Sequence, residues 1–69
     1  MKFNYSKLLG RMKECGFTQL TLAEAIGKSK ATLNAKLNNQ NYFTQPEMIA
    51  ICNVLGIPHK EIHLYFFAV

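Results

Sequence analysis

The residues able to do covalent or metal chemistry are few and widely spaced. The sequence holds two cysteines, two histidines and four acidic residues. His59 and His63 are four residues apart and would supply half of a zinc site, but such a site needs two further ligands and the chain has no CxxC pair. No Ser/His/Asp, Cys/His or paired-carboxylate arrangement is visible. We therefore expect no enzyme, no metal site and no cofactor, with Cys15 and Cys52 acting as small core residues.

The positively charged residues are concentrated in one half of the chain. Residues 1–40 carry seven Lys or Arg and two Glu, a net charge of +5, whereas residues 41–69 carry one Lys and two Glu, a net charge of −1. Concentrated positive charge suits a surface that binds a polyanion such as nucleic acid. An ordinary solvated basic surface has the same composition, so charge alone leaves both interpretations open.

The elements that would position these charges are all helical. Apolar residues recur at three- and four-residue spacing between capping residues and glycines. The pattern predicts helices over residues 5–15, 19–26, 30–38, 45–55 and 59–66. The expected N-caps of the second, third and fourth helices are Thr18, Ser29 and Thr44, and Glu47 completes a capping box with Thr44. A chain of 69 residues has room for one domain.

Residues 19–33 have the spacing of a helix-turn-helix motif. Ala23 is small where two helices would touch, Gly27 suits a tight turn four residues later, and Leu33 is apolar six residues after the glycine. With this motif, the helix order and the final Tyr-Phe-Phe run, the chain resembles the phage Cro and repressor class, also called the Xre-like class.

The resemblance implies a compact all-α, five-helix, lambda-repressor-like domain over residues 1–69. Its helix-turn-helix would span about 19–38, and its C-terminal helix and tail 59–69. Lys28 and Lys36 stand where this class usually has apolar residues. Because a lysine can bury its stem and leave its ammonium in water, we expect both to contact phosphate.

The resemblance also implies sequence-specific binding to a double-stranded DNA operator, as a phage or prophage Cro-like regulator and most simply a repressor. The base-reading positions implied are Ser29, Lys30, Ala31, Asn34 and Ala35. Lys30 suits guanine, Asn34 suits adenine, and the alanine methyls suit thymine. The phosphate-binding positions implied are Gln19, Lys28, Lys36, Asn38, Asn39, Asn41 and Tyr42. Plainer interpretations stay open, since Ser29 is also a cap and the alanines are good helix formers.

The C-terminal segment is richer in apolar side chains than a short terminal helix needs. Ile62 and Phe66 are expected to close the core. The apolar side chains left over are Leu64, Tyr65, Phe67 and Val69. They would either fold back onto the first helix or form the interface of a homodimer that presents two recognition helices to DNA.

A second class of function fits the same fold: a protein-interaction module, antitoxin-like or antirepressor, that acts through another protein. The apolar tail favours it and the positive charge around the motif opposes it. No window reaches the roughly 20 apolar residues of a membrane span, and the first residues lack a signal-peptide core. We therefore expect a cytoplasmic protein with no membrane association and no small-molecule ligand.

Overall fold

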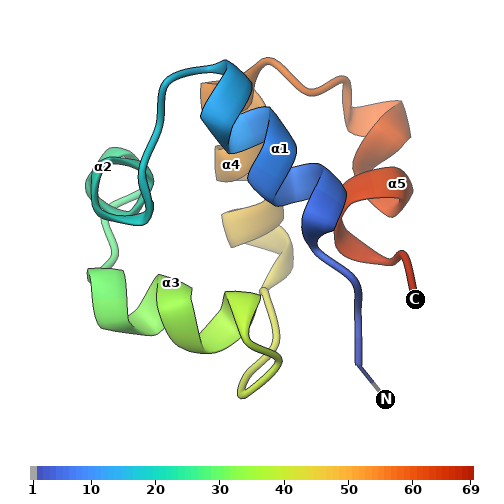
Figure 1. The fold of residues 1–69 in the computed structure, drawn as a ribbon. Coiled ribbons are helices and arrows are strands. Elements are labelled where there is room, and N and C mark those ends of the chain that lie inside the picture. The colour runs from blue at the N-terminus through green and yellow to red at the C-terminus, as the bar shows by residue number, and fades with distance from the viewer. Residues whose placement is uncertain (1) are drawn as a thin grey trace.

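Helices alone form the regular structure of residues 2–69, the part of the chain that the computed structural model describes. The elements are α1 (Ser6–Glu14), α2 (Gln19–Ala25), α3 (Lys30–Leu37), α4 (Gln45–Leu55), a 3₁₀ turn η1 (His59–Glu61) and α5 (Ile62–Phe66). In Figure 1, α2 is seen nearly end-on while α3 lies across the view, so the two helices cross steeply. The predicted all-helical fold with five α-helices is confirmed.

The core forms where the inner faces of all five helices meet. Leu8 of α1, Leu22 of α2, Leu33 of α3, Ile51 of α4 and Phe66 of α5 are all at most 2% exposed. α2 packs on α3 and α4, and α5 packs on α1 and α4. The inner faces of α2 and α3 are therefore buried in the shared core, and their opposite faces remain on the surface.

Local capping chemistry explains where three helices begin. Thr18, Ser29 and Thr44 each accept a hydrogen bond from the backbone N–H three residues later, as predicted. Gly27 and Gly56 end α2 and α4 with φ of +72° and +67°, in the left-handed region that favours glycine. The predicted helix ends differ from the observed ones by about one residue, and the predicted last helix starts as the 3₁₀ turn.

The two cysteines lie in different surroundings. Cys52 is buried, as expected, and burial raises the pKa of its thiol. Cys15 is exposed instead of buried, with its Sγ 3.6 Å from the Leu55 carbonyl oxygen. Among residues 2–69, no three His, Cys, Asp or Glu side chains gather as metal ligands would. None of the helices in that range has the length and apolar character needed to cross a bilayer.

Candidate nucleic-acid interface

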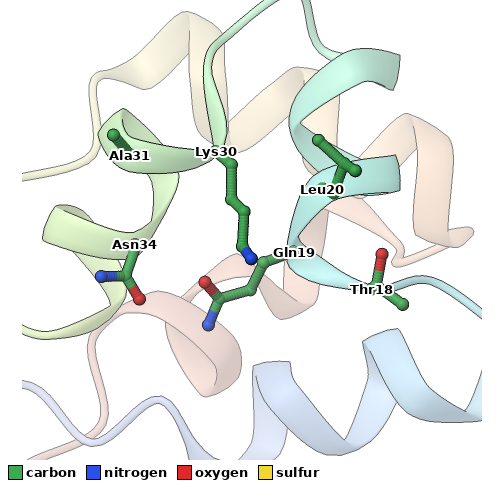
Figure 2. Close-up of a pocket in the computed structure, with 6 residues that line it drawn as sticks. All are labelled: Thr18, Gln19, Leu20, Lys30, Ala31 and Asn34. Atoms are coloured by element: carbon green, nitrogen blue, oxygen red, sulfur yellow. The ribbon is translucent and has the colours of Figure 1, made fainter.

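An open groove lies where the first turn of α2 faces the first two turns of α3. Its lining residues are Thr18, Gln19, Leu20, Lys30, Ala31 and Asn34. Figure 2 shows Lys30 and Gln19 projecting into the space between the two helices, with Asn34 at the α3 side of the same opening. An ammonium and two amides thus meet on one accessible surface, which we call the α2–α3 groove.

The starts of both helices are held by reciprocal hydrogen bonds. Thr18 Oγ1 accepts from the N–H of Thr21 at 3.1 Å, and Thr21 Oγ1 accepts from the N–H of Thr18 at 2.8 Å. Ser29 Oγ accepts from the N–H of Thr32 at 3.1 Å and donates to Thr32 Oγ1 at 2.8 Å. These bonds fix the backbone that carries Gln19 and Lys30. They also occupy the Ser29 hydroxyl, which favours its interpretation as a cap.

Three of the five predicted base-reading residues line the groove together. Lys30, Ala31 and Asn34 are exposed and belong to its wall. Ala35 is half-buried and does not line it. Asn38 Nδ2 donates to Asn34 Oδ1 at 3.1 Å, so the Asn34 amide has a set orientation and keeps its NH2 group free to donate.

The predicted phosphate contacts divide into available and occupied groups. Gln19 lines the groove, and Asn41 and Tyr42 are exposed, Tyr42 by 67%. The Asn39 amide is occupied, because its Oδ1 accepts from the N–H of Phe3 at 2.8 Å and its Nδ2 donates to the Phe3 carbonyl at 2.9 Å. Asn39 has a φ of +62°, which explains why its position suits glycine or asparagine. Its predicted phosphate role is therefore corrected to a structural one.

Lys36 also departs from its predicted role. Its ammonium was expected in solvent, but the residue is only 7% exposed and the ammonium donates to both carboxylate oxygens of Glu47. Lys28 remains half-exposed, with its Nζ 3.7 Å from Glu47 Oε2. The reason is tertiary: the α4 N-terminus places a carboxylate opposite the inner face of α3. Lys36 therefore contacts no phosphate in this conformation.

The protonation state of Glu47 follows from these contacts. Burial alone would raise its pKa, but hydrogen bonds from Lys36 and Thr44 and the positive charge of Lys36 outweigh burial and lower the pKa below its ordinary value. Glu47 is thus an anion near neutral pH. It neutralises Lys36 internally, and Arg11 is also engaged, donating to the Leu55 and Gly56 carbonyls. Among the residues that line the groove, Lys30 carries the positive charge.

The predicted dimer residues do not behave as one set. Tyr65 is half-buried, with Lys7 Nζ 5.4 Å from its ring centroid, so this side chain folds back onto α1. Leu64, Phe67 and Val69 stay 40%, 49% and 84% exposed. Phe67 packs edge-on against Phe3 and also borders an apolar groove beside Met48 and Ile49.

One groove residue was missed from the sequence. Leu20 is 49% exposed and lies in the groove wall beside Gln19. The signal was present, because Leu20 directly follows Gln19, which the resemblance implied as a phosphate-binding position.

Comparison with known proteins places the chain. The family described as a protein of unknown function, DUF739, matches residues 1–69. The chain belongs to this family. Among solved structures, it is similar to the solution structure of the modulator of repression (MOR) of the temperate bacteriophage TP901-1 from Lactococcus lactis. The two share 36% sequence identity over 97% of this chain and 90% of that chain, with a TM-score of 0.82.

Among curated proteins, none matches the chain. The similarity to the modulator of repression relates this chain to a small phage regulatory protein that shares its fold. The finer resemblance to the Cro class is a separate prediction that these comparisons leave open.

Proposed function

We propose that this protein is a phage-type transcriptional regulator whose α2–α3 pair is a helix-turn-helix motif that binds duplex DNA sequence-specifically in the bacterial cytoplasm. The observation that carries the proposal is the α2–α3 groove. There Lys30, Asn34 and Gln19 project from two capped helix starts onto one accessible surface. The name of the similar phage protein, modulator of repression, supports a regulatory role.

Binding requires no chemistry from the protein. Lys30 donates to guanine O6 and N7, Asn34 pairs with adenine, and the Ala31 methyl contacts the thymine methyl in the major groove. Gln19 binds a phosphate at the start of α2. The bound protein then occludes polymerase and represses transcription.

The direct test is fluorescence anisotropy on a labelled duplex from the DNA flanking its gene, beside a scrambled duplex. Lys30→Ala combined with Asn34→Ala should reduce the preference for the flanking duplex about tenfold or more, because each good base contact contributes about 1–3 kcal/mol. Lys60→Ala is the control for lost charge, since Lys60 lies in η1, outside the groove. A double variant that keeps the full preference would contradict the proposal.

A second candidate function is binding of another regulatory protein, such as a repressor, through the same groove. Two observations favour it: Leu20 is 49% exposed in the groove wall, and Lys36 is neutralised by Glu47. Leu20→Ser distinguishes the two. Full burial of a leucine contributes about 1.5–3 kcal/mol, so a protein complex centred on Leu20 should weaken strongly. DNA binding through Lys30 and Asn34 should keep most of its affinity.

We also propose a homodimer on DNA, with a second copy covering the exposed part of the tail. Leu64, Phe67 and Val69 provide apolar side chains without charge. Phe67→Ser combined with Val69→Ser should lower both the mass seen by sedimentation on operator DNA and the affinity. A variant that binds with unchanged mass and affinity would exclude the dimer.

A further inference from the structure

The Glu47 carboxylate sits where three segments of the chain meet. The Lys36 ammonium donates to both of its oxygens, and the backbone N–H of Thr44 donates to Oε1 at 2.8 Å. Lys28 Nζ approaches Oε2 at 3.7 Å. Lys28 precedes α3 and Lys36 belongs to its last turn. One carboxylate at the start of α4 therefore contacts both ends of the helix that carries Lys30 and Asn34.

Burial makes the Lys36 contact the stronger of the two lysine contacts. The side chains of Lys36 and Glu47 are 8% and 7% exposed, whereas that of Lys28 is 46% exposed. A half-exposed ion pair contributes little, but separating a buried pair leaves an uncompensated charge and is strongly unfavourable. The Lys36 pair ties the last turn of α3 to the start of α4. Sliding or rotating α3 on α4 would separate this buried pair.

We propose that Glu47 is the positioning residue of the α2–α3 groove: its carboxylate fixes α3 on α4 and withholds the Lys36 ammonium from external anions. The positioning does not depend on which ligand the groove takes. The consequence for DNA rests on the proposed function: Glu47 raises specificity by keeping Lys30 and Asn34 in register and by keeping one cation from binding phosphate nonspecifically.

Lysine labelling tests the geometry without any ligand. The native protein is treated with limiting acetic anhydride, and each lysine is followed by mass spectrometry, with exposed Lys30 on the same helix as the internal reference. Lys36 should be acetylated at least about tenfold more slowly than Lys30, because its reaction requires an opening of about 1.4 kcal/mol or more. In Glu47→Gln the two rates should converge. Lys36 reacting as fast as Lys30 in the unaltered protein overturns the proposal.

Duplex binding tests the consequence. Glu47→Gln keeps an acceptor for the Thr44 N–H, because glutamine also completes a capping box, but removes the charge that pairs Lys36. The ratio of flanking to scrambled affinity should fall about tenfold, and binding to the scrambled duplex should become more salt-dependent as the freed ammonium contacts phosphate. A residue that only stabilised the fold would weaken both duplexes alike without steepening the salt dependence, and that result overturns the proposal.

Two controls complete the design. Glu14→Gln makes the same charge change at an exposed position of α1 and should leave the ratio unchanged. If Glu47→Gln does not fold, Lys36→Met combined with Glu47→Gln removes the unpaired charge and restores packing. This double variant should fold with a reduced ratio, and a wild-type ratio overturns the proposal. If the unaltered protein itself fails to distinguish the duplexes, the proposed function is wrong, while the labelling result still decides the role of Glu47.

Discussion

Single polar residues near α3 differ in whether their side chains are exposed or are bonded within the fold. Asn39 shows this most clearly: its backbone has a φ of +62° and its amide holds both backbone groups of Phe3. Asn39, two residues after the end of α3, therefore connects this helix to the N-terminal segment. The Asn39 side chain therefore has a structural role.

Replacing Asn39 separates its two contributions. Asn39→Gly keeps the left-handed backbone but loses the bonds to Phe3, and should lower the free energy of unfolding by about 1 kcal/mol. Asn39→Ala also introduces left-handed strain and should cost about 1–2 kcal/mol more. Urea unfolding measures both. Equal stability of the two variants would contradict the strain argument.

The lowered pKa of Glu47 predicts an acid-sensitive part of the stability. The folded state favours the anion more than the unfolded chain does, so this contribution is fully present above the ordinary pKa of 4.5. It is lost as the pH falls through the lowered folded-state pKa. Urea midpoints measured from neutral to acidic pH should drop more steeply for the unaltered protein than for Glu47→Gln. Parallel pH profiles would contradict the assignment.

At the scale of elements, the start of α3 combines an N-cap, Ser29, with Lys30, a residue that we propose reads a base. Ser29 uses its hydroxyl on Thr32. Ser29→Ala should lower the free energy of unfolding by about 1 kcal/mol and Ser29→Gly by only a few tenths, the pattern of an N-cap. Both should keep the preference between flanking and scrambled duplexes. Loss of preference in the stable glycine variant would show that Ser29 reads a base.

A contact could be predicted from the sequence when its two partners lie close together along the chain, and was missed when they lie far apart. The caps Thr18, Ser29 and Thr44 were predicted correctly because an N-cap bonds to a backbone group three residues away. Lys36 was misassigned because its partner is eleven residues away, on another helix. The same holds for Asn39, whose partner Phe3 lies 36 residues away. Lys30, Ala31 and Asn34 were named together because the resemblance implied base-reading positions on the outer face of this helix.

At the scale of the molecule, the tail is part of the core. Phe66 is 2% exposed and packs edge-on against Phe43 at a centroid distance of 5.2 Å. Phe66→Ala should cost about 3–5 kcal/mol, most of the stability of a domain this small, since proteins hold about 0.05–0.15 kcal/mol per residue. Thermal unfolding should show a folded Val69→Ser and a largely unfolded Phe66→Ala. A well-folded Phe66→Ala would contradict this packing.

At the same scale, three of the eight Lys and Arg side chains have partners inside the fold. Lys36 is paired within the core, Arg11 is bonded to the end of α4, and Lys7 lies over Tyr65. Of the remaining cations, Lys30 lines the α2–α3 groove, where the proposed function needs it.

The most direct test of the central claim is fluorescence anisotropy of the unaltered protein on the flanking and scrambled duplexes, at low and near-physiological salt. We predict that binding at the higher salt survives only on the flanking duplex, and that Lys30→Ala with Asn34→Ala removes this preference. Equal, salt-sensitive binding to both duplexes, or no binding to either, would contradict sequence-specific recognition by the α2–α3 groove.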